Sequence, residues 1–232
     1  GEVARVALLE ESERVRDMVL GAVSHDLRTP ITTIRTLAQH PVPAADSGAR
    51  IDEQAARLER LVGNLLDLSR MRADAFPITP EPNVAEDLLG AVARQAHGVV
   101  RDATLAVQHD PTGELLLGRF DFAQLVRALG NLVDNALHVS PPGAVVDLSA
   151  AAEGEWLVFT VADRGPGIAT DDAERIYAPF QRGHDAARDG GTGLGLAIAR
   201  ALAQAHGGWL RHTPRPGGGT TFRLAVPLVR EP

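Results

Sequence analysis

Gly191-Thr192-Gly193-Leu194-Gly195-Leu196 leads directly into a stretch with helical periodicity, residues 194–206. A glycine-rich turn before a helix presents backbone N–H groups, and the helix dipole favours an anion there. The turn is not a Walker A loop, because no Lys-Ser or Lys-Thr pair follows it. It is not a dinucleotide fingerprint either, because no predicted strand precedes it. The polar stretch 181–190 before it is typical of a lid over a nucleotide, and a flexible surface loop is the alternative.

A second glycine-containing turn, Asp163-Arg164-Gly165-Pro166-Gly167, follows a predicted strand over 157–162. An aspartate there could accept a hydrogen bond from an exocyclic amine such as that of adenine. Upstream, Asn131 and Asn135 lie four positions apart, on one face of a predicted helix. Their amide oxygens suit a hydrated Mg²⁺. Taken alone, each motif has a plain alternative, which is an ordinary turn for the first and an exposed polar helix face for the second.

The first third of the chain has the pattern of two long helices joined by a short connection. Residues 2–39 are helical in pattern, and their apolar stripe slips by one position around His25 in Ser24-His25-Asp26-Leu27-Arg28-Thr29-Pro30. Pro30 removes a backbone donor and is expected to bend this helix just after the histidine. After a Pro-containing connection over 40–48, a second apolar stripe predicts a helix over 49–73.

Two helices joined by a short loop form an antiparallel hairpin. A single hairpin cannot cover both of its apolar stripes, whereas two hairpins paired in a four-helix bundle can. The sequence therefore predicts a homodimer. Taken alone, His25 would be interpreted as a solvated helix residue. Six further histidines share no metal-ligand spacing and are interpreted as surface or capping residues: His40, His97, His109, His184, His206 and His212.

Composition limits the classes of function. The 232 residues are 44% hydrophobic and include no cysteine. A real core is therefore expected, while disulfides, thiol catalysis and zinc–thiolate sites are excluded. The formal net charge of −7 argues against nucleic acid as the main partner, because phosphate backbones select basic surfaces. No apolar run is long enough to cross a bilayer. The abrupt helical start at Gly1 indicates a fragment, so a sensor or membrane-attached part would lie upstream.

Composition changes at Phe76-Pro77-Ile78-Thr79-Pro80-Glu81-Pro82. We therefore expect a hairpin domain over 1–74, a linker over 75–82 and a second domain over 83–232. In the second domain the mixed patterns indicate an α+β or α/β sandwich, with helices on one face of a mostly antiparallel sheet. Helices are predicted over 84–97, 121–138 and 194–206, and strands over 105–108, 114–117, 144–152, 156–162, 209–212 and 220–226.

Together, these motifs resemble those of the sensor histidine kinases of two-component signalling. Ser24–Pro30 resembles the H box of that family, Asn131–Asn135 its N box, and Asp163–Gly167 its first glycine box. Residues 176–182 resemble its F box, and Gly191–Leu196 its second glycine box. The motifs follow the family's order and span nearly the whole chain. The combination is therefore far more specific than any single motif.

The resemblance implies a dimeric phosphotransfer hairpin followed by an α/β sandwich of the Bergerat ATP-binding type, similar to gyrase, Hsp90 and MutL. It implies that Asn131 and Asn135 hold Mg²⁺, and that Asp163 selects adenine. Arg182 would meet the terminal phosphates of ATP. The other nucleotide-binding residues implied by the resemblance are His138, Gly165, Gly167, Gly191, Thr192, Gly193, Leu194 and Gly195.

The resemblance also implies a reaction. His25 would attack the γ-phosphorus of ATP through Nε2, while Asp26 holds Nδ1 and takes up its proton. The phosphoryl group would then pass to an aspartate on the receiver domain of a response regulator. Thr29, one helical turn after His25, has the family's position for orienting the water that dephosphorylates the regulator. We therefore expect a cytoplasmic histidine protein kinase that also has phosphatase activity.

One position departs from the family's pattern. His138 lies three residues after Asn135, where a lysine is common. An imidazole is mostly neutral near pH 7, so a fixed positive charge near the phosphates is lost and the expected nucleotide affinity is lower. Two other functions stay open on the sequence. One is an ATPase of the same fold that drives conformational change without His25, and the other is a non-catalytic dimeric scaffold that binds nucleotide weakly.

Overall fold

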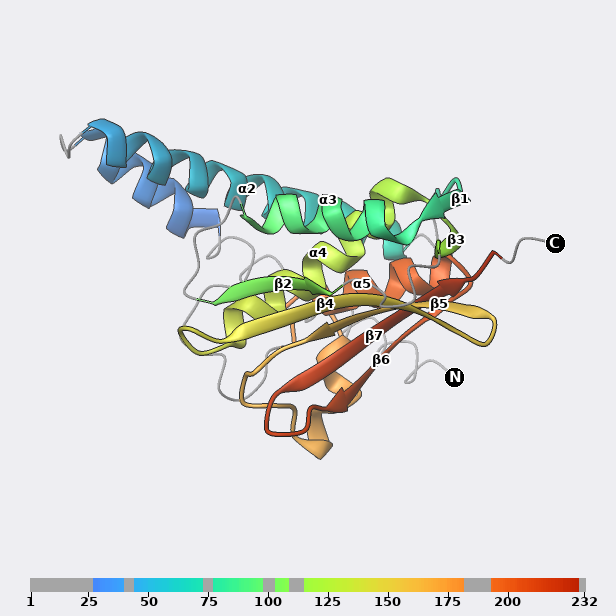
Figure 1. Cartoon of the computed structure of the whole chain (residues 1–232). Coiled ribbons are helices and arrows are strands. Elements are labelled where there is room, and N and C mark those ends of the chain that lie inside the picture. The colour runs from blue at the N-terminus through green and yellow to red at the C-terminus, as the bar shows by residue number, and fades with distance from the viewer. Residues whose placement is uncertain are drawn as a thin grey trace, which may run out of the picture.

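The computed structural model describes residues 27–39, 44–72, 77–97, 103–108, 115–181 and 193–229. Within these ranges a helical hairpin precedes an α/β domain, which is the predicted fold class (Figure 1). Among the helices of these ranges, none is both long enough and apolar enough to span a membrane.

The hairpin contains a helix over 27–39 and α2 (Ala44–Arg72), which run alongside each other in Figure 1. α2 begins at Ala44, within the stretch predicted as the connection. Two alanines directly after Pro43 explain the earlier start, because alanine has the highest helix propensity and proline suits the beginning of a helix. Helical backbone continues through Pro30, whereas the turn where we expected the bend begins outside the described residues.

The α/β domain is built on a sheet with the strand order β2-β4-β5-β7-β6. Only β2 and β4 are parallel, and the other pairs are antiparallel, as the sequence predicts. The helices lie on one face of this sheet (Figure 1). The elements are β1 (Glu81–Val84), α3 (Ala85–His97), β2 (Thr104–Gln108), β3 (Leu117–Phe120), α4 (Phe122–Val139), β4 (Val145–Glu153), β5 (Trp156–Ala162), η1 (Thr170–Asp172), η2 (Arg175–Tyr177), α5 (Gly195–Ala205), β6 (Trp209–Pro214) and β7 (Thr220–Pro227).

One apolar core joins the helices to the sheet. α4 buries a stripe with helical spacing, which includes Leu125, Leu129 and Leu132. The strands contribute alternate side chains, and Phe159 of β5 meets Phe120 edge-on with ring centroids 6.1 Å apart. Because the apolar stripe of α4 faces this core, its polar residues lie on the other faces of the helix.

β3 lies three residues later than the strand predicted over 114–117. Phe120 explains the shift, because its side chain is fully buried whereas Leu115 is 66% exposed. β1, which no pattern in the sequence indicated, begins at Glu81 inside the expected linker and pairs antiparallel with β3. The two short strands form a separate two-stranded sheet.

His206 ties the end of α5 to the start of α4. Its Nε2 accepts a hydrogen bond from the backbone N–H of Asp121 at 3.0 Å, and its Nδ1 lies 2.7 Å from the carbonyl of Leu202. Nε2 therefore carries no proton and Nδ1–H is the donor to Leu202. Asp121 in turn caps α4, because its Oδ1 accepts from the N–H of Gln124 at 3.1 Å. This buried histidine is thus a capping residue, as expected, and it sets how α4 and α5 meet.

Candidate functional site

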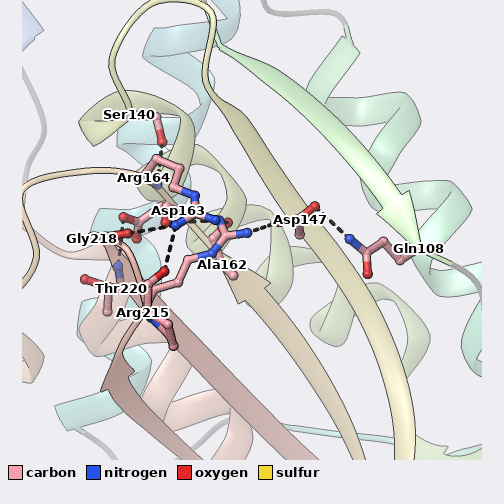
Figure 2. A network of polar contacts seen from close by, with 10 residues as sticks. Gln108, Ser140, Asp147, Ala162, Asp163, Arg164, Arg215, Gly218 and Thr220 are labelled. Carbon is pink, nitrogen blue, oxygen red and sulfur yellow. Dashed lines mark hydrogen bonds and ion pairs between the residues drawn. The ribbon is translucent and has the colours of Figure 1, made fainter.

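The site is built around Asp163, directly after the end of β5. Its side chain is only 1% exposed. Its Oδ1 accepts hydrogen bonds from the backbone N–H groups of Gly165 at 2.8 Å and Thr220 at 3.1 Å, and Figure 2 shows the bond from Thr220. Within the described part of the chain, Oδ2 has no hydrogen-bond partner. One carboxylate oxygen therefore fixes the side chain and the other is left for a ligand.

Burial raises the pKa of Asp163 above its ordinary value of 3.8. The two backbone N–H groups and the charge of Arg215 act in the opposite direction, because they stabilise the carboxylate. Asp163 is thus a carboxyl group out of water that its neighbours hold in place.

Arg215 holds the backbone that carries Asp163. Its guanidinium donates to the carbonyls of Ala162 at 2.9 Å and Asp163 at 3.2 Å, and it forms an ion pair with Asp147. Gln108 completes this network by donating to Asp147 at 2.8 Å (Figure 2). The network joins β2, β4, β5 and the β6–β7 turn, so the backbone that carries Asp163 is anchored from several strands.

Glycines allow the backbone to come close to Asp163. A Cβ at Gly219 would lie 2.2 Å from the carbonyl oxygen of Asp163, and Gly219 has a φ of +102°. A Cβ at Gly165 would lie 2.7 Å from Cγ2 of Val139, and Gly167 has a φ of +84°. Side chains at these places would push the loop outward or strain it.

Asn131 on α4 faces the beginning of α5. A Cβ at Gly195 would lie 3.7 Å from its Oδ1, and its Nδ2 is buried without a hydrogen-bond partner in the described residues. Asn135, one turn later, is half-buried, and His138 is exposed. A buried amide N–H group without a partner, close to the start of α5, is the kind of group to which a polar ligand supplies a hydrogen-bond acceptor.

The two ends of the predicted lid are joined at its base. The N–H of Phe180 donates to the carbonyl of Gly193 at 3.0 Å. Phe180 has the left-handed φ of 65°, and a Cβ at Gly193 would lie 2.7 Å from the carbonyl oxygen of Gln181. Leu194, which directly follows Gly193, is buried. The predicted site residues Arg182, Gly191 and Thr192 lie outside the described residues.

The predicted phosphoacceptor residues His25 and Asp26 also lie outside the described residues. Thr29 is exposed on the first helix of the hairpin, while Pro30 is buried. The backbone carbonyl of Thr29 accepts a hydrogen bond from the hydroxyl of Thr33 at 3.1 Å. The structure thus brings Asn131 to Gly195, and Asp163 to Gly165, which lies against Val139 at the end of α4. Thr29 lies on a separate helical element.

Three contributors to the site were missed by sequence reasoning: Thr220, Arg215 and Gly219. Arg215 and Gly219 belong to the β6–β7 turn, which we expected only to separate two strands, and Thr220 is the first residue of β7. The signal was present in Gly217-Gly218-Gly219-Thr220, because consecutive glycines before a strand indicate a close approach of two backbones.

Comparisons with known proteins agree with this geometry. The model of the His Kinase A (phospho-acceptor) domain matches residues 15–74. The model of the histidine kinase-, DNA gyrase B-, and HSP90-like ATPase matches residues 120–230. The chain belongs to the sensor histidine kinase family. This histidine kinase chain is 33% identical over 240 residues to the sensor protein KdpD of Escherichia coli (strain K12), and the match covers all of the chain and 26% of KdpD.

The histidine kinase chain is also 38% identical over 229 residues to the sensor-like histidine kinase SenX3 of Mycobacterium tuberculosis (strain ATCC 25618 / H37Rv), with 93% of the chain and 54% of SenX3 covered. Among solved structures, full-length ShkA in complex with AMPPNP has 29% identity and a TM-score of 0.62, with 91% of this chain and 46% of ShkA covered. Acinetobacter baumannii AdeS, at 22% identity and a TM-score of 0.65, shares the fold over 89% of this chain and 98% of AdeS. The chain thus spans about a quarter to just over half of the length of these curated relatives.

Proposed function

We propose that this chain is an ATP-dependent protein-histidine kinase that phosphorylates its own His25 and passes the phosphoryl group to an aspartate of a response regulator. The observation that carries the proposal is the buried carboxylate of Asp163, with Oδ1 held by Gly165 and Thr220 and Oδ2 left without a partner in the described residues. An acceptor of this kind suits the exocyclic amine of adenine. The match to the ATPase family model and the similarity to SenX3 and KdpD also support a protein-histidine kinase.

Asn131 and Asn135 would hold a Mg²⁺ ion through their amide oxygens. In the described residues, Nδ2 of Asn131 is buried without a partner beside Gly195, which supports a ligand here. This N–H group can donate to a phosphate oxygen, leaving Oδ1 for the metal. When bound, Mg²⁺ would offset the charge of the phosphates during transfer. Arg182 would meet the terminal phosphates, and the glycines from Gly191 to Gly195 would shape the lid over the nucleotide.

The proposed reaction places a new P–N bond on His25. Nε2 attacks the γ-phosphorus, the bond from that phosphorus to the bridging oxygen breaks, and ADP leaves with the electron pair. The carboxylate of Asp26 takes the proton from Nδ1. The resulting phosphohistidine then transfers its phosphoryl group to the carboxylate of the receiver domain. Because ATP and receiver domains are cytoplasmic, we assign this chain to the cytoplasm.

Phosphate labelling tests this function. The chain is incubated with Mg²⁺ and γ-labelled ATP, and we expect acid-labile, base-stable label on the wild type and on His40→Ala but none on His25→Ala. Equal labelling of His25→Ala would overturn the assignment. Release of free phosphate with no labelled protein would favour the ATPase that drives conformational change.

We propose that the chain acts as a homodimer through its hairpin. Four of the six large apolar side chains most exposed in the described residues belong to the hairpin: Ile31, Val62, Leu65 and Leu66. Pairing of two hairpins would bury them. Leu66→Glu is therefore expected to lower the mass measured by light scattering towards that of a monomer. Leu115→Glu, at an exposed leucine outside the hairpin, serves as the matched control and should leave the mass unchanged.

We also propose that Thr29 takes part in dephosphorylation of the response regulator. Its exposed position on the helix that follows His25 supports this role. Thr29→Ala should keep autophosphorylation and slow the loss of phosphate from a receiver domain, whereas Thr32→Ala, at another exposed threonine of the same helix, should change neither rate. An unchanged rate of dephosphorylation in Thr29→Ala would remove Thr29 from the mechanism.

A further inference from the structure

β6 is an edge strand, and its outer side offers backbone groups for pairing. Among the described strands, β6 pairs only with β7, at the margin of the sheet (Figure 1). The N–H of Arg215 donates to the carbonyl of Gly219, its partner in the same register. In an antiparallel pair, every second residue directs its backbone N–H and C=O groups to the neighbouring strand. The backbone groups of Arg211 therefore point towards β7. The N–H and C=O groups of Leu210 and His212 therefore point outward. In the described residues, no backbone hydrogen bond outside the β6–β7 ladder engages them.

A groove of about 410 Å³ runs along this free edge. One wall is formed by Gly208 and by the first residues of β6, from Trp209 to His212. Residues of η2 and α5 form the opposite wall, among them Tyr177, Arg200 and Gln204. In the described part of the chain, none of the residues that line the groove contacts Asp163 or Asn131.

The side chains of the groove hold one another in place. The hydroxyl of Tyr177 lies 2.8 Å from Nδ1 of His212. Arg200 lies over the ring of Tyr177, with its guanidinium carbon 4.7 Å from the ring centroid. Arg200 also forms a 3.1 Å ion pair with Glu174. Because these walls are already ordered by their own contacts, a ligand would not have to order them on binding.

The uncompensated charge at this edge is positive. Arg211 is exposed and stacks on the ring of Trp209, with its guanidinium carbon 4.5 Å from the ring centroid. No carboxylate of the described residues pairs with Arg211, whereas Arg200 is balanced by Glu174. A positive charge beside a free strand edge, in a chain of net charge −7, favours an acidic partner.

We propose that an extended, acidic segment of a partner protein adds to the sheet as a further strand along β6. Its backbone pairs with Leu210 and His212, while Pro214, which has no N–H, ends the pairing. Side chains alternate along such a strand. Small apolar residues opposite Leu210 and His212 lie on the groove side with Tyr177. Acidic residues opposite Arg211 lie on the other side of the sheet, with Trp209.

A peptide of the pattern Glu-Val-Glu-Val-Glu, blocked at both ends, is the probe. It is titrated into the full chain by calorimetry, and the emission of the neighbouring tryptophans Trp156 and Trp209 provides a second readout. N-methylation of the valines removes the N–H groups that face β6 and should weaken binding at least tenfold. N-methylation of the central glutamate, whose N–H faces away from β6, should leave the affinity unchanged. Equal effects of the two modifications, or no binding of the parent peptide, would overturn the proposal.

Charge and position are tested by matched variants. Arg211→Glu should weaken binding at least tenfold, whereas Arg119→Glu, at an exposed arginine of β3, should not. Both variants should keep wild-type autophosphorylation, which separates this site from the proposed kinase function. A peptide with glutamine in place of glutamate should bind at least tenfold more weakly, and equal affinity would contradict the acidic specificity.

Amide hydrogen exchange locates the contact. The N–H groups of Leu210 and His212 should gain protection when the peptide binds, while that of Arg211 is protected in both states. Protection that rises with protein concentration in the absence of peptide would instead identify a second copy of this chain as the occupant. That outcome, or protection confined to other residues, would overturn the proposal.

Discussion

Asp67 of α2 and Arg127 of α4 form an ion pair that links the helical hairpin to the α/β domain. Nη1 of Arg127 donates to Oδ1 of Asp67 at 2.7 Å, and its Nη2 lies 2.5 Å from Oδ2. The side chain of Asp67 is fully buried, whereas that of Arg127 is 31% exposed. Gly63 leaves room for the guanidinium, since a Cβ there would lie 2.9 Å from Nη2. This two-contact pair holds the C-terminal half of α2 against the domain that carries the candidate site.

The unequal burial of this pair predicts an unequal response to mutation. Arg127→Ala leaves a buried carboxylate without its guanidinium, which costs about 3 kcal/mol of unfolding free energy. Asp67→Ala leaves an arginine that water can reach, and a loss of about 1–2 kcal/mol is expected. Urea unfolding followed by circular dichroism measures both losses. Equal losses would show that the burial of Asp67 does not decide the energetics of the pair.

Asp163→Asn is expected to weaken ATP binding by about ten- to a hundredfold. An amide in place of the carboxylate can keep the bonds to Gly165 and Thr220 through its oxygen, but it then presents an N–H group where the proposed adenine amine needs an acceptor. The loss of one hydrogen bond to a charged group corresponds to about 1.5–3 kcal/mol. Calorimetric titration measures the affinity. Asp171→Asn, at an exposed aspartate of η1, is the control and should bind as the wild type does.

Gly219 and Gly218 provide a matched pair for the support of Asp163. Their φ angles are +102° and +100°, so alanine is strained equally at both positions. Only at Gly219 would the new Cβ collide with a backbone atom, the carbonyl oxygen of Asp163, whereas at Gly218 the space is open. Gly219→Ala should therefore lose about 1–3 kcal/mol more unfolding free energy than Gly218→Ala. It should also bind ATP more weakly, and equal effects would contradict the close approach.

The environment of His212 predicts that part of the unfolding free energy is lost at acidic pH. Burial lowers the pKa of His212 below its ordinary value of 6.5, while the charge of Glu174 acts against this shift. Between the lowered pKa and 6.5 the unfolded chain binds more protons, so the unfolding free energy rises with pH and levels off above about 6.5. His212→Gln should remove this rise. His138→Gln, at an exposed histidine, should keep it, and identical pH profiles of wild type and His212→Gln would contradict the prediction.

Local patterns were enough to predict most elements of the fold. The stripe of α4 and the apolar run of β5 are encoded within single segments, so their predicted limits agree with the structure to within a residue or two. β1 was missed because its four residues carry no alternation of their own and become a strand only by pairing with β3. β3 was misplaced because only the burial of Phe120 against Phe159 decides which residues are extended.

The candidate site divides in the same way. Asp163, Asn131 and the glycines of the two turns were recognisable from residue type and spacing. Thr220 contributes only backbone groups, its N–H and its carbonyl, which almost any residue could supply, and 57 positions separate it from Asp163. Arg215 is an ordinary turn arginine in the sequence and acquires its role only through its contacts with Ala162, Asp163 and Asp147.

By itself, the sequence determined the family, the hairpin followed by a sandwich, and the order of the motifs, because these depend on residue types at short spacings. Only the tertiary structure decided how Asp163 is held, how Asp67 meets Arg127 and which backbone groups of β6 stay free. These features arise from segments far apart in the chain. Their energies come from burial and from hydrogen bonds across strands and helices, which exist only once the chain has folded.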